Sequence, residues 1–172
     1  DSFSTLRMKL ITSLLLITST GAFAGDWITW RGPLNTGVST EHYKDGKLSS
    51  APAWTYESHG RGTPVVYDGK VFSFGYHGEK EELAECLTCM DAKTGAKKWE
   101  VLIKDFISDT VYNRYSIGSP AIDPETKRVY LLTAYGVFGC WDFDGKELWR
   151  QPLPIATTAG NFGSGSSPLL YG

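Results

Sequence analysis

Three cysteines are the residues in this sequence best suited to redox chemistry or metal binding. Cys86 and Cys89 are separated by two residues, whereas Cys140 has no neighbouring cysteine. A C-x-x-C pair can form a redox centre or supply half of a zinc site. If both residues lie on one β-strand, however, they are about 10 Å apart on opposite faces, and a disulfide requires Cα atoms within about 7 Å. We therefore expect Cys86 and Cys89 to be buried structural residues.

The other residues capable of chemistry do not form a recognisable catalytic motif. The sequence contains no glycine-rich phosphate loop, no H-E-x-x-H metal motif and no nucleophile elbow. His42, His59 and His77 have no visible partner in the sequence, and we interpret them as surface residues. The charged run 79–82 (Glu-Lys-Glu-Glu) is typical of a solvated surface. No catalytic, cofactor-binding or metal-binding residue is therefore predicted.

A cluster of aromatic residues around an arginine is the strongest candidate for ligand binding. It lies within segment 104–117, and aromatic and arginine side chains often anchor binding interfaces. Segments 77–84 and 154–165 are also long enough to be functional loops, and rigid scaffolds often carry their binding residues on such loops. The candidate ligand-facing residues are Tyr112, Asn113, Arg114 and Tyr115.

Short β-strands must position these loops. Runs rich in valine, phenylalanine, tyrosine and leucine are bounded by glycine, aspartate and proline, a pattern typical of strands and turns. Asp68-Gly69 favours a tight hairpin turn between the first two runs. Together the four runs predict an antiparallel meander of the size of one propeller blade. The predicted strands are 63–67, 70–76, 85–91 and 97–103.

The same pattern then recurs, which indicates a repeat protein. Trp99 and Trp149 are 50 residues apart, and the prolines that open successive units are spaced by 56 and 48 residues. These spacings are close to the roughly 40–50 residues of propeller repeats. We therefore expect a partial propeller domain over residues 25–172, with blades at about 62–103 and 118–153 and a third unit that begins at 166. The second set of predicted strands is 118–123, 128–134, 137–142 and 147–153.

The densest similarity lies between the third and fourth strand of each repeat. Residues 89–99 read C-M-D-A-K-T-G-A-K-K-W, and residues 140–149 read C-W-D-F-D-G-K-E-L-W. These segments resemble the tryptophan-docking motif, A-x-D-x-x-T-G-x-x-x-W, of the PQQ-dependent (quinoprotein alcohol dehydrogenase-like) propeller family. The resemblance implies an all-β propeller of four-stranded antiparallel blades, in which each tryptophan wedges between blades and each aspartate caps a turn. The implied blade-docking residues are Asp91, Gly95, Trp99, Asp142, Gly145 and Trp149.

Two segments before the first repeat extend the resemblance. Residues 26–27 (Asp-Trp) and 30–33 (Trp-Arg-Gly-Pro) resemble the opening of exported bacterial proteins of this family, to which the outer-membrane barrel-assembly propeller is related. Residues 53–56 (Ala-Trp-Thr-Tyr) resemble an isolated fourth strand, which in a propeller usually closes the ring. A closed ring needs about four to eight blades. With two complete blades, the chain is expected to be the N-terminal fragment of a larger propeller.

The first 24 residues are interpreted as upstream residues followed by a signal peptide. A short basic start precedes an apolar run at 10–17, and Ala22-Phe23-Ala24 follows it. This order is typical of a secretory signal peptide cleaved after its last alanine. We therefore expect a periplasmic or secreted protein with no membrane span after cleavage. Because such a compartment is oxidising, a disulfide between Cys89 and Cys140 remains an open alternative.

Charge and motifs together favour a binding protein. The chain has 17 basic and 19 acidic residues, a formal net charge of −2, which is not the basic footprint of a nucleic-acid-binding protein. The leading interpretation is an exported scaffold that binds a protein or small-molecule ligand on its loop face, without catalysis of its own. The alternative, implied by the resemblance, is a periplasmic PQQ-dependent dehydrogenase that oxidises an alcohol or sugar. That family holds its quinone against a disulfide of adjacent cysteines, near calcium. We expect PQQ and calcium only if other blades supply that site.

Overall fold

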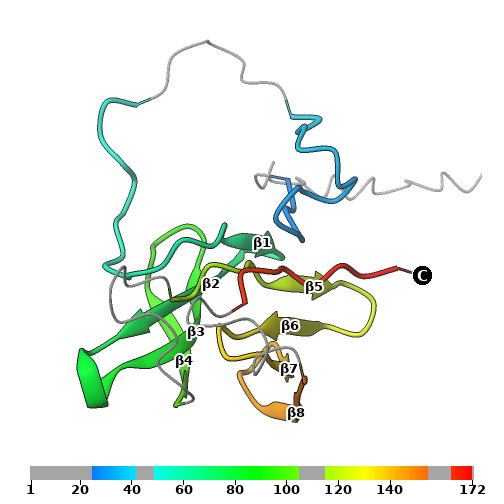
Figure 1. Ribbon diagram of the computed structural model, residues 1–172. Coiled ribbons are helices and arrows are strands. Elements are labelled where there is room, and N and C mark those ends of the chain that lie inside the picture. The colour runs from blue at the N-terminus through cyan, green and yellow to red at the C-terminus, as the bar shows by residue number, and fades with distance from the viewer. Residues whose placement is uncertain (1–24, 42–48, 105–114, 155–163, 172) are drawn as a thin grey trace, which may run out of the picture.

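The chain folds as two consecutive antiparallel sheets of four strands each. The computed structural model describes residues 25–41, 49–104, 115–154 and 164–171. Each sheet is a meander, with the order β1-β2-β3-β4 in the first and β5-β6-β7-β8 in the second (Figure 1). The predicted all-β fold with two propeller blades is therefore confirmed. The strands are β1 (Val65–Tyr67), β2 (Lys70–His77), β3 (Ala84–Asp91), β4 (Lys97–Ile103), β5 (Ala121–Asp123), β6 (Arg128–Leu132), β7 (Val137–Asp142) and β8 (Glu147–Pro152).

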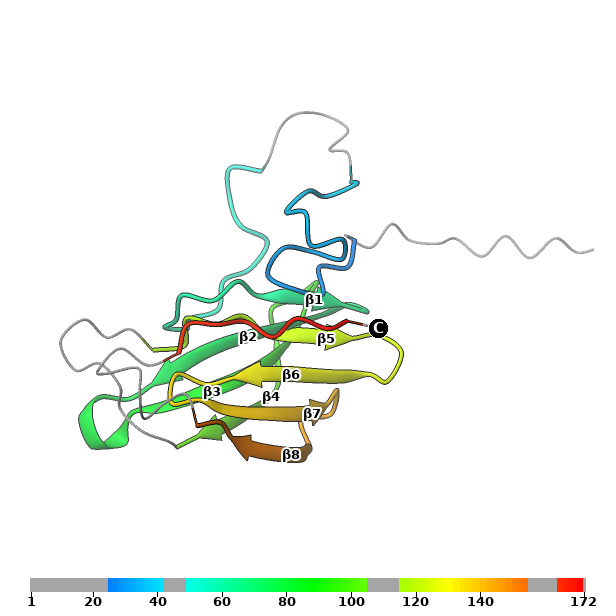
Figure 2. The same ribbon diagram turned by 45° about the vertical axis from the view of Figure 1, so that its right-hand side comes forward.

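The described connections lie at the two ends of the blades. The β1–β2 and β5–β6 turns lie at one end, whereas the β2–β3 connection and the starts of β1 and β5 lie at the other (Figure 2). The β2–β3 connection contains a 3-10 turn, η1 (Lys80–Glu82), whose residues are exposed as the charged run predicted. Asp68 and Gly69 both have positive φ, 48° and 68°, as the predicted tight hairpin requires.

The two blades pack face to face and share one hydrophobic core. Alternate residues of β2 and β3 point into it, because successive side chains of a strand lie on opposite faces. Trp141 of β7 is fully buried between the blades. The face of the first blade that points away from the second is called the outer face below. The buried members of the core are Val65, Phe72, Phe74, Leu87, Cys89, Ile103, Ile122, Val129, Leu131 and Trp141.

Trp99 docks the fourth strand of the first blade onto a turn of the second. Its indole Nε1 donates a hydrogen bond to the Phe143 carbonyl oxygen at 2.8 Å. The ring lies on Gly145, whose φ is +85° and where an added Cβ would be 2.8 Å from Trp99 Cδ2. A side chain at Gly145 would therefore be both sterically blocked and conformationally strained.

Trp54 makes the same contacts one blade earlier. Its Nε1 donates to the Ala92 carbonyl oxygen at 2.9 Å, and its ring lies on Gly95, where an added Cβ would be 2.6 Å from Trp54 Cδ2. Residues 53–56 thus lie against the first blade as β4 lies against the second. This is the position that the fourth strand of a preceding blade would occupy.

Aspartates cap the turns beneath the docked tryptophans. Asp91 Oδ1 accepts hydrogen bonds from the backbone N–H groups of Lys93 and Thr94 at 3.1 and 3.0 Å. Hydrogen bonds from Thr94 and Lys98 lower the pKa of Asp91 to about 2. Asp142 Oδ1 accepts corresponding bonds from the N–H groups of Asp144 and Lys146.

The N-terminal segment lies along the first strand of each blade. Trp27 exchanges two backbone hydrogen bonds of 2.8 Å with Val66 of β1, and the Ile28 carbonyl accepts the N–H of Ile122 of β5. The Trp27 ring lies on Gly32, where an added Cβ would be 2.8 Å from it. The Trp-x-x-Trp-Arg-Gly-Pro opening therefore folds back on itself and bridges the two blades. None of the described helices is long and apolar enough to cross a membrane.

The face of the second blade that points away from the first carries aromatic side chains, of which Trp149 is more exposed to solvent than Trp99. Trp149 is 40% exposed and contacts Phe138 and Tyr130 with ring centroids 5.3 and 6.1 Å away. Although Trp149 occupies the repeat position of Trp99, the described residues place no further sheet against it. The expectation of equivalent buried positions is therefore not met, because Trp99 is partly buried whereas Trp149 is exposed.

Candidate functional site

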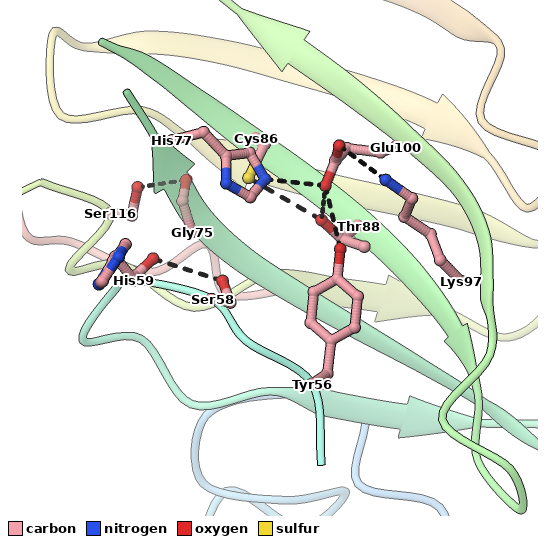
Figure 3. A network of polar contacts seen from close by, with 10 residues as sticks. All are labelled: Tyr56, Ser58, His59, Gly75, His77, Cys86, Thr88, Lys97, Glu100 and Ser116. Carbon is pink, nitrogen blue, oxygen red and sulfur yellow. Dashed lines mark hydrogen bonds and ion pairs between the residues drawn. The ribbon is translucent and has the colours of Figure 1, made fainter. Parts of the chain in front are cut away.

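A polar cluster gathers around Glu100 on the outer face of the first blade. Glu100 Oε2 accepts hydrogen bonds from Thr88 Oγ1 at 3.0 Å and from Tyr56 Oη at 3.3 Å. His77 Nε2 lies 3.0 Å from the same oxygen, and Lys97 Nζ lies 3.1 Å from Oε1. Figure 3 shows these side chains converging from β2, β3, β4 and the segment that precedes the first blade.

Electrostatics keep Glu100 ionised and the nearby thiol protonated. Burial acts to raise the pKa of Glu100, but hydrogen bonds from His77, Lys97 and Thr88 outweigh it and lower the pKa to about 2. Burial raises the pKa of Cys86, which is also in this cluster, to about 11. Burial and the Glu100 charge raise the pKa of Tyr56 as well. A thiol with a raised pKa is a poor nucleophile near neutral pH, so the cluster does not resemble a cysteine active site.

A second site is a hollow of about 490 Å³ at the end of the two blades where β1 and β5 begin. The segments that lead into β1 and β5 form it, together with the N-terminal segment and the start of the third unit. Its polar groups are mostly hydroxyls and backbone groups, with one guanidinium. This hollow, called the axial hollow below, is lined by Trp30, Arg61, Thr63, Ile117, Ser119, Gly165, Ser166 and Ser167.

A ladder of serine hydroxyls builds one wall of the axial hollow. The N–H of Thr63 donates to Ser119 Oγ at 2.7 Å, and the N–H of Ser119 donates to Ser167 Oγ at 2.9 Å. The backbones approach closely, because a Cβ at Gly62 would be 2.2 Å from the Gly118 oxygen. Each serine hydroxyl therefore accepts one N–H from the unit before it and retains its own O–H as a donor.

The buried carboxylate of Glu85 and the residue Ser116 fix the backbone beside this wall. Glu85 is 3% exposed and accepts the N–H of Ser116 at 2.8 Å and the N–H of Ala134 at 3.0 Å. Ser116 has a φ of 49°, and its carbonyl oxygen accepts the N–H groups of Arg61 and Gly62. Glu85 thus couples the wall of the hollow to both blades.

Of the four residues predicted to face a ligand, the structure describes only Tyr115. Tyr112, Asn113 and Arg114 lie outside the described residues. Tyr115 is 3% exposed, and its ring meets Tyr76 edge-on with centroids 5.1 Å apart. Tyr115 is therefore packed within the blade rather than presented to a ligand, which differs from the expectation for that residue.

His77 lies at the surface as interpreted, but it has a partner that the sequence did not reveal. Its side chain is 41% exposed, yet it is paired with Glu100, because β2 and β4 flank β3 and bring residues 77 and 100 together. His59 is exposed, with its ring 5.5 Å from that of Tyr76. His42 lies outside the described residues. The pairing of His77 depends on strand register, which the sequence pattern alone did not specify.

The cysteines are buried, as predicted, and all three are free thiols. Cys89 belongs to the core between the blades, so Cys86, three residues earlier on β3, points to the outer face. Cys140 precedes the core residue Trp141 and so points away from the first blade. Cys89 and Cys140 therefore occupy equivalent positions one blade apart and are not bonded to each other.

The described residues do not fit the quinone and calcium site of the resembling family. No two cysteines are adjacent in the sequence, and no carboxylate is among the residues that line the axial hollow. Calcium takes about six to eight oxygen ligands, with carboxylates prominent among them. Hydroxyls beside a guanidinium suit an anion better than a divalent cation.

Comparisons with known proteins support the fold. The structure is similar to the crystal structure of the quinohemoprotein alcohol dehydrogenase from Comamonas testosteroni, with a TM-score of 0.56 and 21% sequence identity. The match covers 85% of this chain and 22% of that chain, so the sequence spans under a quarter of that protein. No family model and no curated protein matches the sequence. At this identity the likeness concerns the fold alone, a PQQ-like β-propeller of which the described residues form two blades.

Proposed function

We propose that this chain is part of an exported propeller that acts as a binding scaffold, with the axial hollow as its ligand site. The observation that carries the proposal is the serine ladder on the wall of the hollow. It brings two hydroxyl donors from successive units, Ser119 and Ser167, to one concave surface. Concave sites with a few convergent polar groups are typical ligand sites.

The donors favour a ligand group with acceptor oxygens, such as a carboxylate or phosphate. Each hydroxyl accepts one N–H from the protein and retains its O–H, which can be donated to such an oxygen. Arg61 contributes positive charge to the same lining. Trp30, 52% exposed, offers a flat apolar surface beside these groups. The candidate loop residues Tyr112, Asn113 and Arg114 follow the first blade in the sequence and stay part of this proposal.

Export is the second element of the proposal. Its support is the leader pattern at residues 1–24, which is typical of a cleaved signal peptide. A periplasmic or secreted scaffold would meet its partner outside the cytoplasm. The alternative function, a PQQ-dependent dehydrogenase acting on an alcohol or sugar, is favoured by the likeness of the fold. Fold likeness alone does not carry chemistry, and the residues of the axial hollow do not fit a quinone beside calcium.

Binding at the axial hollow can be tested by NMR with small oxyanions. The amide resonances of the labelled chain would be followed during titration with malonate or inorganic phosphate, and glucose would serve as a neutral probe. We expect saturable shifts at Ser119 and Ser167 with an oxyanion. Loss of one hydrogen bond, about 1 kcal/mol, should weaken binding about fivefold in Ser167→Ala. Ser39→Ala, an exposed serine of the N-terminal segment, is the control. Shifts confined to other residues, or equal binding by Ser167→Ala, would contradict the proposal.

A further inference from the structure

Three side chains of different chemistry meet on the outer face of the first blade. The imidazole of His77, the thiol of Cys86 and a carboxylate oxygen of Glu100 all lie within 4.8 Å of one another. They come from β2, β3 and β4, so the register of the sheet, and not a flexible loop, brings them together. In Figure 3 the His77 ring lies over the Cys86 sulfur and points toward Glu100.

The second blade shows that the fold does not require these residues. The strand register aligns Cys89 with Cys140 and Trp99 with Trp149, because each cysteine pairs with the tryptophan of its own blade. Cys86 therefore corresponds to Val137, and Glu100 corresponds to Arg150. A blade of the same topology is thus built with an apolar and a basic residue at these two positions, where the first blade carries a thiol and a carboxylate.

The surrounding residues hold the carboxylate as outer-shell partners hold a metal ligand. Thr88 Oγ1 and Lys97 Nζ bond Glu100 at 3.0 and 3.1 Å, and such partners orient ligands and tune a site. Gly75 pairs with Cys86 across the sheet, and Cys86 itself is fully buried. The His77 side chain is 41% exposed and that of Glu100 is 16% exposed, so solvent can reach the cluster from the His77 side.

We propose that His77, Cys86 and Glu100 bind one zinc-class divalent ion. Zinc accepts sulfur, imidazole nitrogen and carboxylate oxygen, and at its usual bond lengths tetrahedral ligand atoms are about 3.5 Å apart. The observed separations of at most 4.8 Å therefore need shifts of about 1 Å, within the reach of side-chain rotation. Three protein ligands leave one coordination position, which solvent or an added ligand occupies from the exposed side.

Cys89 has no part in this site, although its spacing from Cys86 suggests a C-x-x-C metal pair. It is buried in the core between the blades, on the opposite face of β3. The proposal does not rest on the proposed function, because the cluster and the axial hollow share no residue. A bound ion would also stabilise the structure. Tyr56, in the segment that precedes the first blade, donates a hydrogen bond to Glu100, so an ion on Glu100 would strengthen the contact between that segment and the blade.

The test uses the full chain, stripped of metal with a chelator and titrated with Zn²⁺ and, separately, with Co²⁺. We expect one equivalent of Zn²⁺ by calorimetry, and a thiolate-to-cobalt charge-transfer absorption with Co²⁺. Loss of an outer-shell partner already weakens metal binding about 10–100-fold, so Cys86→Ala, His77→Ala and Glu100→Gln should each weaken it by more than about 100-fold. The matched controls are Cys89→Ala, on the same strand, and His59→Ala, an exposed histidine beside the cluster.

The controls make each outcome decisive. Unchanged binding in Cys89→Ala and His59→Ala, together with loss in Cys86→Ala, would support the site. Absence of the charge-transfer band in the wild-type chain would overturn the proposal even if a Cys86 variant did not fold. Loss of binding in Cys89→Ala with retention in Cys86→Ala would overturn it too, as would equal Zn²⁺ binding by the wild-type chain and Cys86→Ala.

Discussion

Replacing Trp99 with phenylalanine should destabilise the chain far more than the same change at Trp149. Trp99 donates a hydrogen bond of 2.8 Å to Phe143 and packs against Gly145 and Phe72. Phenylalanine retains much of the ring contact but removes the N–H donor and part of the buried surface. The hydrogen bond contributes about 1 kcal/mol, and the smaller buried ring adds about 0.5–1 kcal/mol at the usual apolar coefficient. We expect a loss of about 1.5–2 kcal/mol in the free energy of unfolding.

Trp149 supplies the matched comparison because it holds the same repeat position. It is 40% exposed, and its contacts with Tyr130 and Phe138 would survive in part with phenylalanine. We expect a change within about 0.5 kcal/mol, as for other surface substitutions. Urea unfolding followed by far-ultraviolet circular dichroism measures both variants. Equal losses at the two positions, or a negligible loss at Trp99, would refute the inference that Trp99 docks the blades.

Three further predictions concern the turns and the leader. Gly145→Ala should lower the free energy of unfolding by at least about 1 kcal/mol more than Gly69→Ala. Both glycines have positive φ, but of the two only Gly145 would place the new Cβ against an indole, at 2.8 Å. Urea unfolding midpoints of the two variants measure the difference. Hydrogen bonds from Thr94 and Lys98 lower the pKa of Asp91 from 3.8 to about 2, so its stabilising effect is complete above the unfolded pKa and disappears as the pH falls toward 2. Asp91→Asn should flatten that part of the acid-unfolding curve, and an unchanged curve would count against the cap. Mass spectrometry of chain expressed with its leader in a bacterium should find Gly25 at the new N-terminus of the exported product; a retained leader would remove the basis for export.

The strands were predictable because their signals are local. Alternation along β2 and the Asp68-Gly69 turn define one hairpin without knowledge of the rest of the chain. The recurrence of tryptophan after aspartate and glycine then indicated the blades. Residues 53–56 do not form a strand in the structure, but Trp54 contacts the first blade as Trp99 contacts the second. Its hydrogen bond to Ala92 could be seen only once the sheets were placed.

The candidate sites were harder to predict because they depend on register between distant strands. Glu100 directly follows the motif tryptophan Trp99 and carries no pattern of its own, yet it meets His77 across three strands. The serines of the axial hollow were visible as the openings Gly118-Ser119-Pro120 and Ser166-Ser167-Pro168. Their role was missed because the pattern that marks the start of a strand does not show that successive starts are hydrogen-bonded around one hollow.

The central proposal is that this chain binds ligands through its axial hollow and that its own residues do not hold a quinone. Titration of the full-length protein with PQQ in the presence of calcium tests it most directly, with absorbance to follow binding and dye reduction by simple alcohols to follow turnover. A quinone enzyme needs the cofactor oriented beside suitable electrostatics, and the hydroxyls and guanidinium of the hollow do not provide the carboxylates that calcium requires. We predict no saturable binding of PQQ and no dye reduction. One-to-one binding with alcohol-dependent dye reduction would contradict the account and establish the dehydrogenase alternative.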